Sequence, residues 1–545
     1  MYKPKPMPEP MILPREFVRM CRRNMRRPKI ADTTGVDMNG GSLLMRTLIF
    51  RRLLLREVLG PDEQFVGLLV PPSAGAVLAN IAVPLCGRVP VNLNYTVSSE
   101  VMNSCIRQAN IKHVLTSRKV LERFNLQIDS ELVYLEDFRQ MVTTTDKVVA
   151  AFQAFACPLG LLEKTLGLDK IKDDDLLTVI FTSGSTGEPK GVMLTQRNVA
   201  SNVECVDYLL QLRPEDCVAG ILPFFHSTGF TTTLWTALAL DPKGAYHTSP
   251  LEARQVGEMC RKNHVTILVS APTFLRNYLR RCQPEDFASV EMVLTGAEKL
   301  PIELSEAFEK KFGVRPGEGY GTTELSPIVA FHVPKSRATK PEQRGWPEGT
   351  VGMPIPDVHV KVVDPESGKE LNPGQEGVLW FKGPNVMKGY LNRPDLTAKV
   401  IKDGWYNSGD VGRVTPEGCI QITGRQSRFS KIGGEMVPHI KVEETLQAVT
   451  AADPDEVKFA VTGVPDPSRG ERLVVLYTDL PMSPEEVCRG LAAAGLPNIW
   501  IPSPASFCHV DAIPVLGTGK LDLRGLKELA LERFGERGEA AGARS

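Results

Sequence analysis

The sequence predicts an α/β fold, α+β over the whole chain, with a large N-terminal domain, a β-rich subdomain and a small C-terminal domain. Three observations support this prediction. From about residue 60 to 330, apolar strand-like runs alternate with helical patterns, which is typical of βαβ units and parallel sheets. From about 350 to 425, short strands alternate with turn residues. From about 426 onwards, helical and strand patterns form a compact α+β arrangement.

The individual segments follow this division in order. In the first region the strand–helix pairs include FVGLLV (65–70) with AGAVLANIAV (74–83), LLTVIFTS (176–183) with QRNVASNVECVDYLLQL (196–212), and VEMVLTG (290–296) with PIELSEAFEKKF (301–312). The β-rich region contains the strands VHVKVVD (358–364), GVLWFKG (377–383) and GCIQITG (418–424). The last region pairs the helix IKVEETLQAVT (440–450) with the strand VKFAVTGV (457–464).

Composition and charge exclude several classes of protein. The 545 residues are 42% hydrophobic and 23% charged, with 64 Lys and Arg against 64 Asp and Glu. A nucleic-acid-coating protein is usually basic overall, so we expect no nucleic-acid partner. Extensive disorder is excluded as well, because it requires low hydrophobicity and high net charge.

The cysteines and the apolar segments predict a protein of a reducing compartment. The eleven cysteines form no CxxC pair, and the N-terminus lacks the apolar core of a signal peptide. We therefore expect a cytoplasmic protein. The uncharged stretch 65–87 contains Pro71, Pro72 and Pro84, which favours a buried strand, a turn and a buried helix over a membrane span.

Residues 1–29 form a basic segment with nine Lys or Arg and two Glu. Phe17, Cys21 and Met25 recur at helical spacing within it. We favour a solvated helix with one packed stripe. The alternative is a basic amphipathic helix that contacts the inner face of a membrane peripherally.

A hydroxyl- and glycine-rich loop follows the apolar strand that begins at Leu176. Glycines let a backbone approach a polyphosphate, hydroxyls donate to its oxygens, and a lysine adds positive charge. The loop does not match the Walker A pattern. We predict that it binds phosphate through Thr182, Ser183, Gly184, Ser185, Thr186, Gly187 and Lys190.

With this loop, the chain resembles the adenylate-forming superfamily of acyl-CoA synthetases, peptide-synthetase adenylation domains and luciferases. Four further motifs follow in the family's order, and the resemblance spans about residues 30–530. They are LPFFHSTGF (222–230), LTGAEKL (294–300) with GYGTTE (319–324), GWYNSGDVGRV (404–414) with GR (424–425), and GTGK (517–520).

Three segments most resemble the acyl-acyl-carrier-protein synthetase half of a bacterial bifunctional 2-acylglycerophosphoethanolamine acyltransferase. They are LPFFHSTGFTTTLWTAL (222–238), VLTGAEKL (293–300) and GRQSRFSKIGGEMVPHIKVEE (424–444). This resemblance implies a long-chain fatty acid substrate. Because only about 29 residues precede the match in this sequence, we expect it to lack the acyltransferase half.

The resemblance implies the following roles. Lys520 is the catalytic lysine that bridges the carboxylate and the α-phosphate. Glu324 binds Mg²⁺, with Thr182 as a second ligand. Carboxylate, hydroxyl and phosphate oxygens suit that ion.

The nucleotide contacts and the acyl pocket come from the same resemblance. Tyr320 stacks on adenine, Thr323 contacts the α-phosphate, Asp410 accepts from the ribose hydroxyls and Arg425 donates to the ribose. The turn that lines the adenine and acyl sites comprises Gly296, Ala297 and Glu298, and the loop around Tyr320 adds Gly321 and Thr322. The acyl pocket candidates are Phe225, His226, Ser227 and Gly229.

The resemblance also implies two moving units. Residues 30–425 form the AMP-binding domain of two βαβ-rich sheets, with the β-rich subdomain at about 350–425. Residues 426–532 form a mobile lid, and 533–545 a tail. The hinge follows Arg425, where Ser427 replaces the more common Asp or Lys. Arg428, Lys431 and Gly433-Gly434 would then meet the thiol donor.

The expected activity is an ATP- and Mg²⁺-dependent acid–thiol ligase. It would activate a fatty acid as acyl-AMP and form a thioester on CoA or on the phosphopantetheine of acyl-carrier protein. Two alternatives stay open. One is a ligase for aryl or amino acids, and the other is a non-catalytic acyl- or nucleotide-binding relic.

Overall fold

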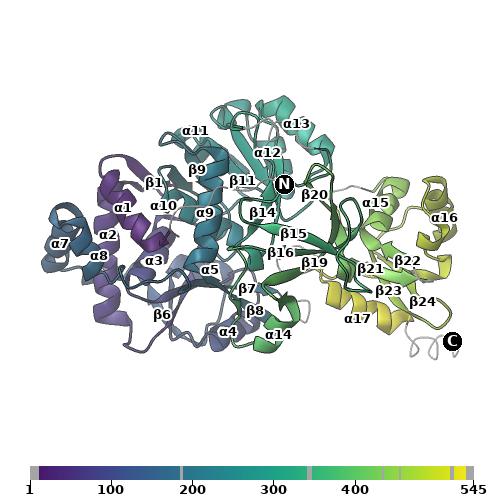
Figure 1. The fold of residues 1–545 in the computed structure, drawn as a ribbon, viewed down its shortest axis with the longest axis horizontal. Helices are drawn as coiled ribbons and strands as arrows, with labels where there is room; N and C mark the ends of the chain where they lie inside the picture. Colours follow the sequence, from purple (N-terminus) through teal and green to yellow (C-terminus); the bar gives the residue numbers. More distant parts are fainter. Residues whose placement is uncertain are drawn as a thin grey trace.

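A computed structural model describes residues 11–183, 188–339, 347–432, 435–452, 456–515 and 521–534. The molecule is elongated (Figure 1). Helices from the first third of the chain lie at one end, and the C-terminal part, coloured yellow, lies at the other. The mixed α/β fold with a large N-terminal and a smaller C-terminal domain confirms the predicted fold class.

The largest sheet has eight strands, six of them parallel. Helices α11 (Ala253–Asn263), α12 (Pro272–Arg281) and α13 (Ile302–Phe312) connect successive parallel strands, as the strand–helix alternation predicts. The strands run in the order β14 (Ile328–Phe331), β13 (Gly317–Gly321), β12 (Met292–Thr295), β11 (Ile267–Ser270), β9 (Cys217–Gly220), β10 (Lys243–Tyr246), β1 (Pro28–Asp32) and β2 (Asp37–Asn39), and both edge strands are antiparallel.

The second βαβ sheet has four parallel strands. Their order is β4 (Val89–Asn92), β3 (Phe65–Leu69), β5 (His113–Thr116) and β6 (Glu131–Tyr134), with crossover helices α3 (Ala74–Leu85), α4 (Ser99–Gln108) and α5 (Arg118–Phe124). The uncharged stretch 65–87 thus forms the strand β3 and the helix α3, as predicted. No helix within the described part of the chain has the length and apolarity needed to cross a bilayer.

A three-stranded sheet corrects one sequence prediction. The strand β7 (Leu176–Ser183) does not lead directly into the helix α9 (Gln196–Leu210). Between them, β8 (Pro189–Thr195) returns antiparallel to β7 and then pairs with β17 (Gly389–Tyr390). On β8, the buried Val192 and Leu194 alternate with the partly exposed Met193. Such alternation in the sequence is the pattern that indicates a strand.

The β-rich subdomain and the C-terminal domain follow the predicted order. The first contains β15 (His359–Val363), β16 (Gly377–Lys382), α14 (Pro394–Val400), β18 (Ile401–Lys402), β19 (Trp405–Val414) and β20 (Ile420–Arg425). The second contains β21 (Phe429–Ile432), β22 (Glu435–Pro438), α15 (His439–Thr450), β23 (Phe459–Asp466), β24 (Gly470–Tyr477), α16 (Pro484–Ala493), β25 (Phe507–His509) and α17 (Leu523–Phe534). The helix α17 includes residues 533 and 534, the first two residues of the predicted tail, and residues 535–545 lie outside the described part of the chain.

The N-terminal helix α1 (Leu13–Arg23) packs its apolar stripe inward. Leu13, Phe17 and Cys21 are fully buried against the main core. This outcome confirms the packed stripe of the favoured interpretation for Phe17 and Cys21, whereas Met25 lies beyond the end of the helix. The predicted boundary at residue 29 falls inside β1, where the buried Lys29 ammonium donates to the carbonyl oxygen of Pro242 at 3.1 Å. All eleven cysteines are free, and nine are buried.

Candidate active site

Two predicted motifs lie at the carboxyl ends of adjacent parallel strands. Leu294 of β12 pairs with Gly317 of β13. The turn at Gly296 therefore lies beside the loop that follows Tyr320, at the sheet edge where ligands of open α/β folds bind. A Cβ atom at Gly321 would collide with the Pro327 carbonyl oxygen, so glycine is required at this bend.

The turn from Gly296 to Glu298 is strained and partly exposed. Ala297 has a φ angle of +69°, in the left-handed region. The Glu298 carboxylate is exposed and accepts a hydrogen bond of 2.8 Å from the hydroxyl of Thr273, at the start of α12. The backbone of this turn, rather than the Glu298 carboxylate, faces the loop after β13.

The predicted ribose contacts form one cluster with Tyr320. Asp410 of β19 pairs directly with Arg425 of β20, and the Arg425 Nε atom lies 2.6 Å from the buried Asp410 carboxylate. The Tyr320 hydroxyl donates to the other carboxylate oxygen. Burial and then the Asp410 charge raise the pKa of Tyr320 well above its usual value, so the hydroxyl stays protonated. A carboxylate has about four lone-pair sites, so Asp410 keeps acceptor capacity for ligand hydroxyls.

A second cluster joins the phosphate loop to Glu324. Thr182 of β7 lies opposite Lys190 of β8. The Lys190 ammonium lies 5.5 Å from the centre of the Tyr390 ring, and the Tyr390 hydroxyl donates to Glu324 at 2.9 Å. Burial and the Glu324 charge raise the pKa of Tyr390, which keeps the donor proton in place. No sequence motif indicates Tyr390, because its strand pairs with β8 across about 200 residues.

Several predicted residues lie outside the described part of the chain. They are Gly184, Ser185, Thr186, Gly187, Gly433, Gly434 and Lys520, and of Ser183 only the backbone is described. Their predicted roles stay predictions.

The donor set around Glu324 fits Mg²⁺. The two predicted ligands, the Glu324 carboxylate and the Thr182 hydroxyl, are oxygen donors, which this hard cation prefers, together with substrate phosphates. Among the residues that the structure describes, no group of three or more His, Cys, Asp or Glu forms a closed metal site. The arrangement therefore suits a metal that is shared with a phosphate ligand.

The four predicted acyl-pocket residues lie in four different environments. Phe225 is buried, and its ring contacts the Tyr95 ring edge-on at 4.9 Å between centroids, so it belongs to the smaller core cluster that packs on the four-stranded sheet. His226 is exposed beside it. The buried Ser227 donates to the Thr323 hydroxyl at 3.3 Å. Gly229 packs against the Pro223 backbone, where a Cβ atom would collide. Ser227 is thus the residue of this motif that contacts the predicted α-phosphate site.

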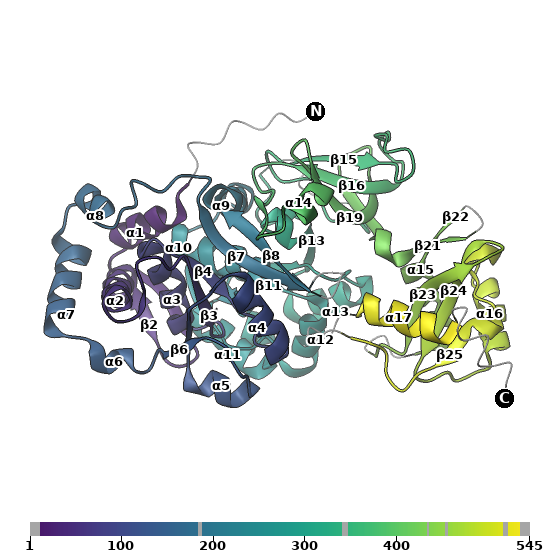
Figure 2. The same cartoon turned by 90° about the horizontal axis from the view of Figure 1, so that it is seen from below.

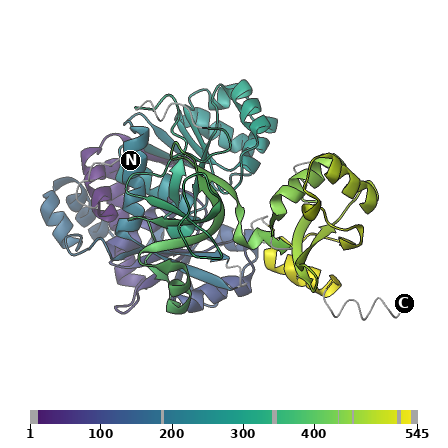
Figure 3. The ribbon, with the colours of Figure 1, turned by 45° about the vertical axis from the view of Figure 1, so that its right-hand side comes forward.

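The two cations of the C-terminal domain that were predicted to meet the thiol donor both form ion pairs. Arg428 is buried and pairs with Glu443. Lys431 is half exposed and pairs with Glu366 of the β-rich subdomain, and Lys299 pairs with Glu444 at 3.0 Å. Figures 2 and 3 show the C-terminal domain set apart from the rest of the molecule beyond β20.

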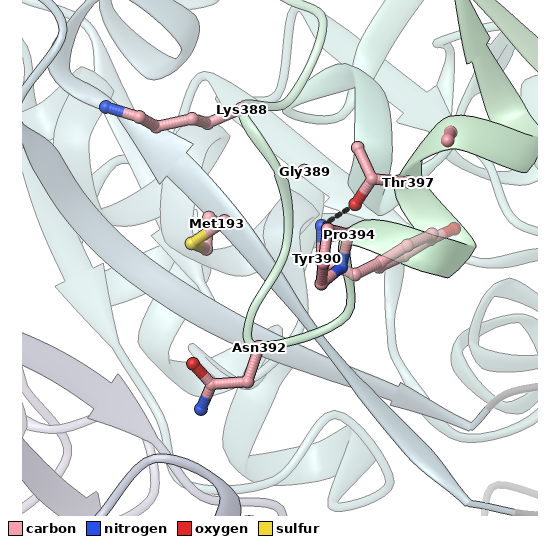
Figure 4. A pocket seen from close by; sticks show the side chains of 8 residues that line it. Met193, Lys388, Gly389, Tyr390, Asn392, Pro394 and Thr397 are labelled. Carbon is pink, nitrogen blue, oxygen red and sulfur yellow. Dashed lines mark hydrogen bonds between the residues drawn. The ribbon is translucent and has the colours of Figure 1, made fainter.

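A shallow hollow of about 390 Å³ lies next to this site, between β17 and α14. Figure 4 shows the side chains that line the hollow. The Tyr390 backbone N–H donates a hydrogen bond of 2.9 Å to the Thr397 hydroxyl. None of the residues predicted to bind ATP lines the hollow. The Thr397 contact fixes the short strand that carries Tyr390.

In the structure, the predicted ribose contacts form one polar cluster with Tyr320, and the predicted metal ligand Glu324 forms another with Tyr390. The family of AMP-binding enzymes matches residues 17–391. The chain therefore belongs to this family of adenylate-forming enzymes.

Three comparisons characterise the similarity. The long-chain-fatty-acid–CoA ligase of Bacillus subtilis is 28% identical over 538 residues, covering 92% of each chain. A feruloyl-CoA synthase of Amycolatopsis is 31% identical over 368 residues, which is 66% of this chain and 70% of that protein. The o-succinylbenzoate–CoA synthetase of Bacillus subtilis in complex with ATP and magnesium shares the fold with a TM-score of 0.75 at 21% identity, covering 94% and 99% of the two chains.

The contact between Tyr390 and Glu324 leads to a testable prediction. Tyr390→Phe removes a hydrogen bond to a carboxylate, worth about 1.5–3 kcal/mol, so we expect the KM for MgATP to rise roughly tenfold or more. The KM for the acid should change little. Steady-state pyrophosphate release measures both, with Tyr134→Phe on β6 as the matched control. Equal changes in the two KM values would contradict the assignment.

Proposed function

We propose that this enzyme uses ATP and Mg²⁺ to activate a long-chain fatty acid as an acyl adenylate. It then transfers the acyl group to a thiol, either CoA or the phosphopantetheine of acyl-carrier protein. The observation that carries the adenylation step is the Lys190–Tyr390–Glu324 contact chain, because it joins the phosphate hairpin to the metal-binding carboxylate.

The first half-reaction joins two anions. A carboxylate oxygen attacks the α-phosphorus of ATP, a P–O bond forms, and the bond to pyrophosphate breaks. Bound Mg²⁺ supplies charge neutralisation on the phosphate oxygens. Lys520 places its ammonium between the carboxylate and the α-phosphate, and Thr323 donates to that phosphate. Catalysis is then mainly positioning and charge stabilisation.

The nucleoside is held by the first cluster. Tyr320 stacks on adenine, Asp410 accepts from the ribose hydroxyls, and Arg425 donates to the ribose. The pairing of Asp410 with Arg425 supports this role, because it orients both side chains before the ligand binds.

The second half-reaction releases AMP. The thiol sulfur attacks the acyl carbonyl carbon, a C–S bond forms, and the mixed anhydride bond to AMP breaks. We infer that the C-terminal domain rotates between the two steps about the segment after Arg425. Lys299 and Lys431 form exposed ion pairs between the C-terminal domain and the rest of the molecule. Each exposed pair stabilises this arrangement by only about 0–1 kcal/mol, so the pairs can break when the domain rotates, which supports the inference.

The similarity to the Bacillus subtilis ligase along 92% of both chains supports a long-chain fatty acid as substrate. An aryl acid is the second candidate, because the feruloyl-CoA synthase is 31% identical over two thirds of this chain.

A panel of acids in ATP–pyrophosphate exchange discriminates the two candidates. We expect exchange to be stimulated by palmitate and not by ferulate or 4-coumarate. Thioester formation with CoA and with acyl-carrier protein as separate acceptors then identifies the thiol. Exchange with ferulate alone would overturn the fatty acid assignment, and no exchange with any carboxylate would overturn the adenylation.

A further inference from the structure

A group of short helices forms one end of the molecule, and we call it the outer lobe (residues 138–168). It contains α6 (Phe138–Met141), α7 (Thr144–Ala151), the π-helical turn η2 (Phe152–Ala156) and α8 (Leu159–Thr165). Figures 1 and 2 both place α7 and α8 at the end opposite the C-terminal domain. The lobe takes no part in the candidate active site.

The outer lobe exposes large apolar side chains. Of the twelve strongly exposed large hydrophobic residues in the described chain, five lie between residues 141 and 161. They are Met141, Val148, Phe152, Phe155 and Leu161, with exposures of 42%, 63%, 59%, 46% and 54%. Singly exposed apolar residues are ordinary on protein surfaces, but a concentration in one segment marks an interaction site.

The helix formed by α7 and η2 has an inverted amphipathic pattern. Its buried side carries Asp146, Ala150 and Ala154, at helical spacing. Its exposed side carries Val148 and Phe152, one turn apart. A surface helix normally buries its large apolar residues and exposes its polar ones. This reversed pattern therefore indicates that the exposed side of the helix contacts an apolar partner outside the protein.

Arginines from the neighbouring helices hold the lobe in place. The Asp146 carboxylate is fully buried and pairs with Arg52 and Arg56, each at 2.9 Å. Burial alone would raise the pKa of Asp146, but hydrogen bonds from Arg56 and Thr143 outweigh it and hold that pKa well below its usual range. Arg22 of α1 donates to the Ala154 carbonyl oxygen at 2.7 Å. The exposed apolar side chains thus project from a fixed support.

The charges around the apolar side chains are basic. On the lobe, the Glu163 carboxylate pairs with Arg19 at 2.8 Å, and Asp146 is buried. The exposed Arg139, Lys147 and Lys164 make no ion pair with a carboxylate in the part of the chain that the structure describes. Arginines thus neutralise both acidic side chains of the lobe, whereas the positive charges of Arg139, Lys147 and Lys164 remain at its surface.

The end of α1 extends this basic rim. Gly41 of the helix α2 (Gly40–Leu53) lies against both the Phe155 ring and the Met25 carbonyl oxygen. The exposed Arg26 and Arg27 follow Met25 directly, so they lie near the exposed ring.

We propose that the outer lobe docks on the surface of a bilayer that contains anionic phospholipids. Val148, Phe152 and Leu161 enter the boundary between headgroups and acyl chains, while Lys147, Lys164 and the arginines after α1 contact the phosphates. A second copy of this chain is a poorer occupant, because a two-fold interface would bring the same basic surface against itself. The apolar contact comes from the lobe, since the apolar stripe of α1 is buried.

This mode of docking leaves catalysis unobstructed. The C-terminal domain lies at the far end of the molecule and stays free of the bilayer (Figure 1). The inference does not depend on which acid the enzyme activates, and binding to vesicles is measured independently of adenylation.

Flotation of the full-length enzyme with vesicles tests the proposal. We expect binding to vesicles of phosphatidylcholine with phosphatidylglycerol and little binding to phosphatidylcholine alone. Val148→Glu with Phe152→Glu should reduce binding at least about tenfold. Lys147→Glu with Lys164→Glu should reduce it by more than about tenfold, since each lost cation contributes about fivefold.

Two matched controls and one further measurement complete the test. Leu251→Glu, at an apolar residue that is 64% exposed elsewhere, and Lys310→Glu on α13 should bind vesicles like the unchanged enzyme. Circular dichroism and pyrophosphate exchange verify that each variant is folded. The proposal is overturned if the enzyme binds neither vesicle, if the lobe variants bind normally, or if the controls weaken binding equally. It is also overturned if light scattering shows a dimer that Phe152→Glu dissociates.

Discussion

Lys520→Ala is expected to abolish acid-dependent ATP–pyrophosphate exchange. The ammonium is proposed to neutralise the two anions that meet in the first half-reaction, and removing one such preorganised group commonly costs about 100–1000-fold in rate. The same variant should still convert supplied acyl-AMP and CoA to acyl-CoA, because the thiol attacks a neutral carbonyl carbon and AMP leaves without help from this lysine. Measuring both half-reactions on one preparation separates the two roles.

The control for this experiment is Lys441→Ala, an exposed lysine on α15 of the same domain. It should retain both half-reactions. Loss of both activities in a well-folded Lys520→Ala enzyme would contradict the assigned role, and so would exchange at the rate of the unchanged enzyme.

Glu324→Gln is expected to reduce adenylation by at least about 100-fold, because an amide replaces the proposed metal-binding carboxylate. The substitution keeps the size of the side chain and leaves an oxygen that can accept from Tyr390. We therefore expect the loss to appear in the dependence on Mg²⁺. A titration of exchange activity against Mg²⁺ should shift strongly to higher concentration.

Glu303→Gln, at an exposed position near the start of α13, serves as the control and should show the Mg²⁺ dependence of the unchanged enzyme. If Glu324→Gln retains both the rate and the Mg²⁺ requirement, the metal site must be assigned to other residues.

The fold could be predicted from local patterns wherever neighbouring segments pair with each other. Strand–helix alternation is a local signal, and it predicts the parallel strands that α11, α12 and α13 connect. The hairpin of β7 and β8 does not fit this alternation, because a second strand of seven residues follows the phosphate loop and its other partner is β17, near residue 390. Sequence patterns do not carry such long-range pairing.

The candidate site follows the same rule. Asp410 and Arg425 lie on β19 and β20, two consecutive strands of one sheet. The turn between these strands brings the two residues together, as their shared role at the ribose predicts. Tyr390 contacts Glu324 only because β17 is paired with β8, and no motif in the sequence indicated it. The burial of Phe225 and Arg428 could not be predicted from the motifs that contain them, because burial depends on the packing of distant segments.

Transfer of an isotope from the acid to AMP tests the central claim of acyl-adenylate formation most directly. Palmitate labelled with ¹⁸O in its carboxylate is incubated with ATP, Mg²⁺, CoA and the enzyme, and the nucleotide product is analysed by mass spectrometry. The proposed mechanism predicts AMP that carries one ¹⁸O atom, because a carboxylate oxygen becomes bonded to the α-phosphorus and leaves with AMP. Unlabelled AMP, or ADP with labelled inorganic phosphate, would contradict it.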